Sequence, residues 1–177
     1  MTPRPLVFIT VGTDHHPFHR LMDWIEPWLA GRPELDCVVQ HGSSRPPAGA
    51  RCHELLPHER MEELLRGADA VVCHGGPGTI TAARDAGRLP IVVPRRAALG
   101  EHVDDHQVRF TRLMAEQRLI VRPESAEELA ARLDLALAEP ARFAVREDGA
   151  DRTAATAARF TTLVEELMAR PRRRRPH

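Results

Sequence analysis

Three short stretches of the chain carry side chains whose types and spacing could do chemistry. The first is CHGGPGT, in which His74 ends an apolar run and Thr79 opens an Ala-rich segment. Glycine is costly within regular structure, so Gly75, Gly76 and Gly78 need a physical reason. They indicate either a tight corner that packs a helix on a sheet or a place where the backbone approaches a ligand closely.

The ligand interpretation of this stretch is an anion cradle. The free N–H groups at the start of a helix, together with the positive end of its dipole, bind phosphate. Thr79 adds a hydroxyl donor and His74 an imidazole donor. The spacing lacks the Gly-Lys-Ser/Thr of a P-loop and does not form GxGxxG after a first strand, so neither ATP hydrolysis nor dinucleotide binding follows. Corner and cradle both stay open on these residues alone.

The second stretch is VGTDHHPF, which also follows an apolar run. Gly12 and Thr13 offer a second anion cradle. Asp14 beside His15 and His16 pairs a carboxylate with two imidazoles, which tunes a histidine toward general-base chemistry near neutral pH. The same residues suggest a metal site, but no further ligand spacing supports one, so we expect no metal and no cofactor. Either histidine alone also fits an ordinary surface position.

The third stretch is GEHVDDHQ, which lies just before a segment of helical period. It crowds carboxylates, imidazoles and an amide at a helix start, through Glu101, His102, Asp104, Asp105, His106 and Gln107. Sugar recognition needs such groups, because each hydroxyl must be offered a donor or an acceptor. A capped helix on a solvated loop explains the same residues.

Strand-like and helical segments alternate along the chain and must position these stretches. This order is typical of βαβ units and predicts an α/β, Rossmann-like fold, with a mostly parallel sheet and helices on both faces. Because ligands of such sheets bind at the carboxyl edge, we expect all three stretches there. Strands are expected at Leu6–Val11, Asp36–Gln40, Cys52–Leu56, Asp69–Cys73, Leu89–Val93 and Leu119–Val121. Helices are expected at Phe18–Ala30, Pro57–Arg66, Gly78–Ala86, from Asp104 or Asp105 to Glu116, Ser125–Leu137 and Arg152–Met168.

Composition narrows the class of protein. The 177 residues suit one domain, and a formal net charge of zero gives no global attraction to nucleic acid. Three single cysteines indicate reduced thiols and a cytoplasmic protein, and we expect neither a signal peptide nor a membrane span. We assign residues 1–168 to the folded domain and 169–177 to a basic tail, either disordered or in contact with an anionic membrane.

Together the stretches resemble a known family. The order TVGTxxxxFxRL, ADAVVCHGGPGT, GRLPIVVPR and GEHVDDHQ, within roughly residues 5–140, is similar to the MurG-like C-terminal domain of glycosyltransferase family 28. That domain is the nucleotide-sugar-binding half of a GT-B fold. Short members look like donor-binding subunits of two-component UDP-sugar transferases, of the bacterial exopolysaccharide type or the dolichol-linked second-GlcNAc type. In those enzymes a membrane-anchored partner binds the acceptor.

The resemblance implies a role for each stretch. The diphosphate of a UDP-sugar would be held by His74, Gly75, Gly76, Gly78 and Thr79, with Gly12 and Thr13 opposite. The sugar hydroxyls would be contacted by His106 and Gln107, with Glu101 or Asp105. The backbone around Leu55–Pro57 would face the uracil. In single-chain relatives a Glu binds the ribose where this sequence has Ala82, so ribose binding must come from elsewhere.

The sequence therefore predicts the donor-binding subunit of an inverting, metal-independent UDP-sugar glycosyltransferase (a hexosyltransferase). It would act on a lipid-linked glycan with a membrane-anchored acceptor-binding partner, as a hetero-oligomer peripheral at the inner face of the plasma membrane. The general base is His15 or His16, or belongs to the partner. The last expected helix carries an apolar stripe that fits either the chain's own sheet or the partner: Phe160, Leu163, Val164 and Met168.

Two other functions stay open. One is a non-catalytic module that binds a nucleotide sugar, or only a partner, and enhances a separate transferase. The other is a different GT-B class such as a UDP-sugar epimerase, which needs both halves of the fold and is disfavoured by the short chain.

Overall fold

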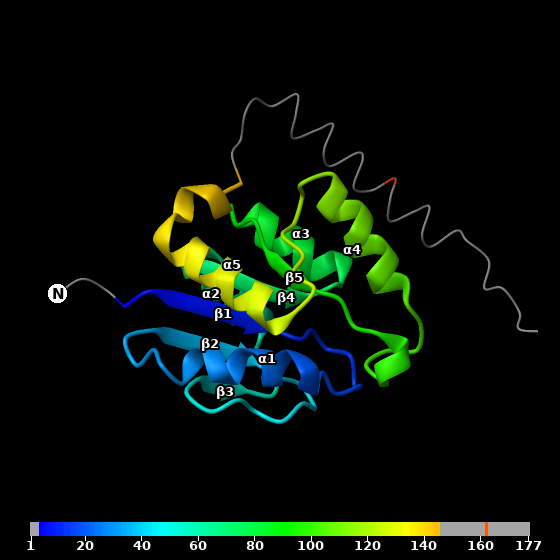
Figure 1. Ribbon diagram of the computed structural model, residues 1–177, viewed down its shortest axis with the longest axis horizontal. Coiled ribbons are helices and arrows are strands. Elements are labelled where there is room, and N and C mark those ends of the chain that lie inside the picture. The colour runs from blue at the N-terminus through cyan, green and yellow to red at the C-terminus, as the bar shows by residue number, and fades with distance from the viewer. Residues whose placement is uncertain (1–3, 146–161, 163–177) are drawn as a thin grey trace, which may run out of the picture. The chain divides into compact units, whose positions relative to one another are not determined.

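The computed structural model describes residues 4–145 and 162. Its centre is a five-stranded sheet in the order β3-β2-β1-β4-β5, in which every neighbouring pair of strands runs parallel (Figure 1). The strands are β1 (Leu6–Thr10), β2 (Asp36–Gln40), β3 (Arg51–His53), β4 (Ala70–His74) and β5 (Ile91–Val93). The predicted α/β fold with a mostly parallel sheet is confirmed.

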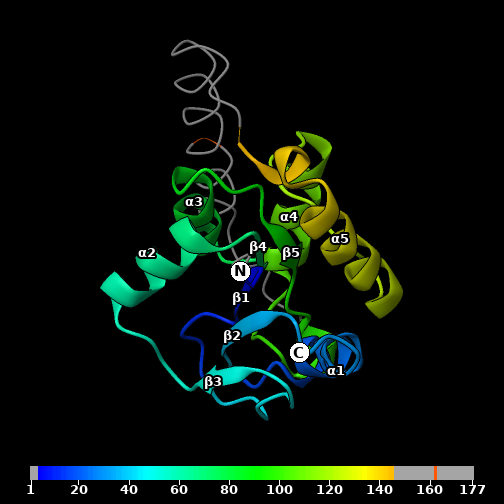
Figure 2. The same cartoon turned by 90° about the vertical axis from the view of Figure 1, so that its left-hand side faces the viewer.

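Helices cover both faces of this sheet. One face carries α1 (His19–Leu29) and α5 (Ala126–Ala138), and the other carries α2 (His58–Gly67) and α3 (Pro77–Asp85), as Figure 2 shows. Helix α4 (His106–Glu116) follows the segment after β5. Two short 3-10 helices, η1 (Ala97–Leu99) and η2 (Pro140–Phe143), complete the elements of the described residues.

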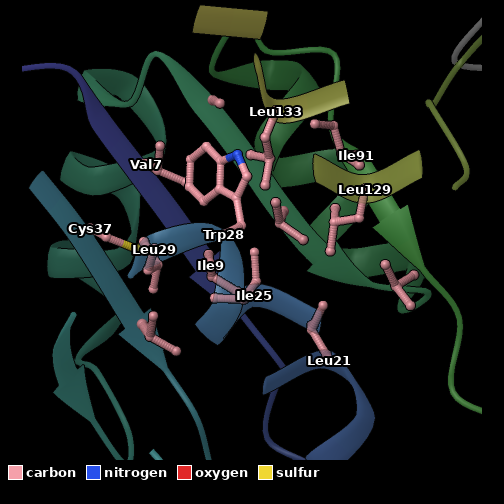
Figure 3. Close-up of a cluster of buried hydrophobic side chains, with 14 of the residues drawn as sticks. Val7, Ile9, Leu21, Ile25, Trp28, Leu29, Cys37, Ile91, Leu129 and Leu133 are labelled. Atoms are coloured by element: carbon pink, nitrogen blue, oxygen red, sulfur yellow. The ribbon is translucent and has the colours of Figure 1, made fainter. Parts of the chain in front are cut away.

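The side chains of β1 alternate between two separate cores. Val7 and Ile9 enter the larger cluster, where they meet residues of α1 and α5 such as Ile25 and Leu133 (Figure 3). Phe8 points the other way, into the cluster formed with α2 and α3. Because both faces of β1 are buried, its sequence is a continuous apolar run instead of an alternating pattern.

The structure corrects the expected bounds of several elements, among them β5, which begins at Ile91 and not at Leu89. β3 ends at His53, not Leu56, because the chain leaves the sheet before Pro57, which stands at the N-cap of α2. α3 begins at Pro77, one residue earlier than predicted. Proline suits the first helical position because its missing N–H would have no partner there.

The strand predicted at Leu119–Val121 is not a strand of the sheet. Val121 forms a single parallel bridge to Ile91, with its N–H bonded to the carbonyl of Pro90 at 3.0 Å. Pro123 lies two residues further on and has no N–H with which to continue a ladder. The chain therefore touches the edge of β5 once and turns into α5.

The predicted helix starts at Ser125 and near Asp104 are confirmed. Ser125 Oγ accepts from the N–H of Glu128 at 3.2 Å, and Asp104 Oδ1 accepts from the N–H of His106 at 3.0 Å. The helix expected at 152–168 and the tail at 169–177 fall outside the described residues, apart from Thr162. Within the described part, no helix has the length and apolar character needed to cross a membrane.

Candidate functional site

The three chemistry-bearing stretches come together at the carboxyl edge of the sheet. β1 lies between β2 and β4, so the strand order reverses between β1 and β4. Open α/β sheets bind ligands in the crevice at such a switch point. We call the segments that follow these strands the β1 loop (residues 11–17), the β4 loop (residues 75–76) and the β5 loop (residues 94–105).

The imidazole of His74, at the end of β4, is enclosed by two backbone segments. A Cβ on Gly12 would lie 2.4 Å from Cε1 of the ring, and a Cβ on Gly76 would lie 2.2 Å from Nε2. Gly12 also has a φ of +77°, a conformation that side chains rarely adopt. Both glycines are therefore required by the position of His74.

Gly75 and Gly78 have different surroundings. A Cβ on Gly75 would lie 2.9 Å from Cγ2 of Thr111 and 3.0 Å from Cβ of Gln107, so close packing against α4 explains this glycine. Nothing lies within 4 Å of a Cβ on Gly78, which is exposed in the first turn of α3. The tight-corner interpretation thus accounts for Gly75 and Gly76, whereas the space at Gly78 is what an anion cradle requires.

His74 is neutral at physiological pH. Its side chain is 9% exposed, and the buried Nδ1 has no hydrogen-bond partner among the described residues. Burial lowers the pKa of His74 to about 3, and the positive charge of Arg95 acts in the same direction. A neutral imidazole offers one N–H donor and one acceptor, so it can bind a ligand oxygen without bringing a charge into the core.

The N-terminus of α3 adds backbone donors beside His74. No side chain caps this end of the helix, where Gly76 is the N-cap and Pro77 the first residue. The N–H groups of Gly78 and Thr79 have no partner in the described part of the chain, because the first helical bond runs from Ile80 to the carbonyl of Gly76. Free N–H groups and the positive end of the dipole together favour an anion.

Arg95 is a buried cation that ties two loops together. It has no exposed surface, and its Nη2 donates to the carbonyl of Val11 at 2.8 Å. Its Nη1 donates to the carbonyls of His16 at 2.7 Å and Glu101 at 3.0 Å. Its guanidinium carbon lies 5.0 Å from the centre of the Phe18 ring. Sequence reasoning missed Arg95, because an arginine in a polar loop is normally exposed.

Gln107 links the β4 loop to the β5 loop from the first turn of α4. Its Oε1 accepts from the N–H of Gly75 at 3.0 Å and from the N–H of Arg95 at 3.1 Å. The side chain is 3% exposed. Its acceptor is therefore occupied, and its Nε2 amide is the group that is left to donate to a ligand.

Glu101 is committed to the shape of the β5 loop. Its side chain is 5% exposed, and its carboxylate accepts hydrogen bonds from Nε and Nη2 of Arg20 at 2.9 and 2.8 Å. The same carboxylate accepts from the N–H of Arg96 at 2.8 Å, and Arg20 also donates to the carbonyl of Pro94. A direct contact between Glu101 and a sugar stays a prediction.

Two aspartate–histidine pairs with the same local geometry occupy the β1 and β5 loops. Asp14 Oδ1 accepts from the N–H of His16 at 2.7 Å and lies 2.6 Å from its Nδ1. Asp104 Oδ1 accepts from the N–H of His106 at 3.0 Å and lies 2.5 Å from its Nδ1. An ionised carboxylate only accepts, so each Nδ1 carries the proton and each Nε2 is left as a free base.

These aspartates are ionised in spite of partial burial. Burial alone would raise the pKa of Asp14, but hydrogen bonds from His16 and the charge of Arg95 outweigh it and leave the pKa below its ordinary value. The same balance, with bonds from His106, lowers the pKa of Asp104. Each histidine therefore faces a negative charge.

His102 lies between the two pairs. Its Nε2 is 3.4 Å from Oδ2 of Asp14, and its Nδ1 is 3.8 Å from Oδ1 of Asp104. Its ring centre is 6.1 Å from that of His16 and 4.6 Å from that of His106. Sequence reasoning named His102 among the polar groups of this loop but gave it no role of its own, although the alternation of His, Asp and His at 102, 104 and 106 was a visible signal.

The other predicted site residues lie at the same edge with weaker connections. Thr13 and His15 are exposed in the β1 loop, and the His15 ring stacks 4.0 Å from that of His16. Asp105 is exposed, and its Oδ1 accepts from the N–H of Ala97 at 2.9 Å. Ala82 is half-buried and packs against the core cluster between α2 and α3.

Residues 6–164 match the model of the glycosyltransferase family 28 C-terminal domain. The chain belongs to this family. Comparison with curated protein sequences gave no match. The match to the family 28 domain includes the β1, β4 and β5 loops, so the switch point between β1 and β4 lies inside the matched region.

Solved glycosyltransferases share the fold of this family 28 domain. Spinosyn forosaminyltransferase SpnP has a TM-score of 0.56 at 20% identity, with 95% of this chain and 40% of that chain covered. MurG of Acinetobacter baumannii has a TM-score of 0.54 at 21% identity, with 81% and 44% covered. The kitacinnamycin glycotransferase has a TM-score of 0.53 at 19% identity, with 94% and 39% covered.

The chain thus spans 39% to 44% of the length of these structures. Its sheet and helices form one Rossmann-like half of a GT-B fold.

Proposed function

We propose that the chain is the donor-binding subunit of an inverting, metal-independent UDP-sugar glycosyltransferase. The observation that carries this proposal is the pairing of His74, neutral and with an unpartnered buried Nδ1, with the free N–H groups of α3. Both lie at the switch point of a family 28 domain, where a nucleotide diphosphate needs donors.

In this proposal the diphosphate lies over the first turn of α3. The N–H groups of Gly78 and Thr79, the Thr79 hydroxyl and an N–H of His74 donate to its oxygens, and Gly12 and Thr13 close the other side. The space above Gly78 lets the phosphate approach the backbone. The adjoining glycines, Gly75 and Gly76, hold Gln107 and His74 in place.

The same groups stabilise UDP as it leaves. Negative charge develops on the β-phosphate as the glycosidic bond to the donor breaks, and preorganised donors lower the energy of that state. The helix dipole and the buried charge of Arg95 act in the same sense. These fixed positive charges supply what a magnesium ion supplies in other transferases, which is why the proposal is metal-independent.

The sugar is assigned to the β5 loop and the start of α4. His106 presents a free Nε2 acceptor, Gln107 its Nε2 donor, and Asp105 a carboxylate oxygen. Glu101 contributes by holding this loop through Arg20. The uracil is assigned to the backbone around Leu55–Pro57. Ribose contacts are assigned neither to this backbone nor to Ala82, because Ala82 packs toward α2.

His16 is the better candidate than His15 for the general base. Asp14 holds the Nδ1 proton of His16, so its Nε2 is free to take the proton of an acceptor hydroxyl. His15 is exposed and has no carboxylate partner among the described residues. If His16 is not the base, that group belongs to the acceptor-binding half.

The acceptor-binding half is proposed to be a separate, membrane-anchored subunit that carries a lipid-linked glycan. The chain would then be cytoplasmic and held at the inner face of the plasma membrane through this partner. The support for this arrangement is the resemblance to two-component transferases, and the hexosyl donor is part of the same proposal.

A non-catalytic nucleotide-sugar-binding module is the second candidate. The occupied carboxylate of Glu101 and the absence of a ribose-binding Glu at Ala82 favour it. The two functions separate in a reconstituted pair of subunits. A catalytic role requires that the reconstituted pair turns over UDP-sugar and that the pair with a His74→Ala subunit does not.

Calorimetric titration with UDP tests the proposed donor site. His74→Gln and Thr79→Ala should each weaken binding at least tenfold, the equivalent of about 1.4 kcal/mol. His58→Gln is the matched control, because His58 is 84% exposed on α2. Unchanged affinity in both site variants would overturn the cradle.

A further inference from the structure

Three side chains converge on one point. Two of them belong to the β5 loop, and the third belongs to the first residue of α4. His102, Asp104 and His106 each offer a ligand atom, and these atoms lie within 4.8 Å of one another. Asp104 Oδ1 is 3.8 Å from Nδ1 of His102 and 2.5 Å from Nδ1 of His106. The two imidazole rings are nearly perpendicular, at 80°. Two imidazoles and a carboxylate are a common ligand set for zinc.

The proton position of His102 suits a cation at this point. His102 Nδ1 accepts from the N–H of Asp104 at 3.4 Å, so its lone pair faces Asp104 and its proton is on Nε2. That Nε2 lies 3.4 Å from Oδ2 of Asp14 in the β1 loop. A metal-bound histidine usually directs its other N–H at a carboxylate, which fixes the ring and raises its basicity. Asp14 is placed to do this.

The backbone that carries the ligands is already fixed. Asp105 Oδ1 holds the N–H of Ala97, and Asp104 Oδ1 holds the N–H of His106. The ligand side chains of the β5 loop are half-buried, and His102 is 13% exposed. Little conformational entropy would be lost when an ion binds, because the loop is held before it arrives.

We propose that His102 Nδ1, the Asp104 carboxylate and His106 Nδ1 bind one divalent transition-metal cation, with Asp14 orienting His102 from the opposite loop. Tetrahedral zinc with bonds of about 2.0–2.1 Å separates its ligand atoms by roughly 3.3 Å. The observed separations of 2.5 and 3.8 Å lie on either side of that value. On binding, the proton of His106 moves from Nδ1 to Nε2, and nothing is oxidised or reduced.

The ligand set selects among cations. Two imidazole nitrogens favour Zn²⁺, Co²⁺ or Ni²⁺, whereas Mg²⁺ and Ca²⁺ require oxygen ligands. The second cluster at this edge, Asp14 with His15 and His16, is the less suitable one. His15 is exposed, whereas both histidines of the first cluster, His102 and His106, are half-buried.

This inference rests on the ligand geometry and is independent of the proposed transferase activity. If the chain also binds a UDP-sugar, the ion on Nδ1 moves the proton of His106 to Nε2, so that Nε2 can no longer accept a bond from the sugar. Zinc would then weaken the binding of the UDP-sugar at a place that is distinct from the diphosphate cradle.

Zinc titration of the purified chain by calorimetry tests the proposal. One Zn²⁺ should bind per chain, and His102→Ala and His106→Ala should each weaken it at least tenfold, with a normal circular dichroism spectrum. Asp14→Asn should weaken it about tenfold, as expected for a group that orients a ligand. The control is His58→Ala, because His58 also faces a carboxylate, Glu62, at 3.1 Å on an exposed helix.

Cobalt absorption identifies the ligand atoms. Bound Co²⁺ should show the visible bands of nitrogen and oxygen ligation. A sulfur-to-cobalt charge-transfer band would place the ion at a cysteine and overturn the proposal. Unchanged zinc affinity in His102→Ala and His106→Ala would overturn it as well, as would loss of binding in His16→Ala alone.

Discussion

Gly76 and His74 compete for the same volume. A Cβ on Gly76 would lie 2.2 Å from Nε2 of the His74 ring, and 2.9 Å from Cε1. The glycine at this position therefore exists so that an imidazole can lie against the backbone at the end of β4. The first turn of α3 and the ring form one surface because of this contact.

Alanine at Gly76 and at Gly78 should have opposite effects. Gly76→Ala must displace His74 and should lower the free energy of unfolding by about 1–3 kcal/mol. Gly78→Ala meets nothing within 4 Å and should leave stability unchanged or raise it, because alanine favours the helix. It should nevertheless weaken UDP binding by filling the space above α3. Denaturation and calorimetry check both, and tight UDP binding by Gly78→Ala would contradict the proposed phosphate position.

Stability should fall in acid partly because of His74. Burial lowers its pKa to about 3 from an ordinary value of 6.5, so the unfolded state binds more protons between these values. The contribution of His74 to stability is complete above pH 6.5 and is lost as the pH falls toward 3. Urea denaturation of His74→Gln should therefore show a smaller loss over this window. Parallel curves for the two proteins would refute the buried neutral histidine.

The carboxylate of Glu26 should stabilise the segment between β2 and β3 above acid pH. Its bonds from Arg45 and from the N–H of Ala48 lower the pKa of Glu26 from 4.5 to about 2. Because the folded-state pKa is depressed, this contribution is present above pH 4.5 and lost as the pH falls through 2. Glu26→Gln should be less stable than the wild type at pH 6, and the difference should shrink toward pH 2.

Removing the buried charge of Arg95 should destabilise the β1 and β5 loops at the carboxyl edge of the sheet. Arg95→Met leaves the carbonyls of Val11, His16 and Glu101 without their donor and should cost about 3 kcal/mol or more. Arg96→Met is the control, because Arg96 is half-buried and its side chain makes a long ion pair, 3.6 Å, with Glu124. Equal stability of the two variants, measured by thermal denaturation, would argue against this role of Arg95.

The three thiols should differ in reactivity. Burial raises the pKa of Cys37 and of Cys73 to about 12, so neither forms a thiolate at pH 8. Cys52 is half-buried, and burial raises its pKa less than theirs. Labelling with a chromogenic disulfide should modify one thiol per native chain, slowly, and three after unfolding. Mass spectrometry should locate the first label at Cys52.

Much of the fold could be predicted because its signals are local. Apolar runs such as those of β1 and β4 indicate strands buried on both faces, and the glycines and prolines between segments mark the turns. The stretch at Leu119–Val121 carries the same apolar signal, yet it forms one bridge only, because strand membership depends on neighbours that the sequence of a segment does not specify.

The site could be predicted only in part. The glycines of CHGGPGT were informative, but their reasons are tertiary: Gly12 is needed because of His74, which lies 62 positions away in the sequence. Arg95 was missed because its partners are backbone carbonyls, which have no sequence signature. His102 was given no role of its own because its importance comes from Asp14, a residue of another loop.

The repeated Asp-x-His element has a further consequence. In both copies one carboxylate oxygen holds the backbone N–H and the Nδ1 of the histidine two residues later. Two of the hydrogen bonds that direct each imidazole therefore lie within three consecutive residues. Each aspartate–histidine pair would keep these two hydrogen bonds if its loop moved. The three-residue element could therefore be grafted onto an unrelated turn to hold an imidazole base in a chosen direction.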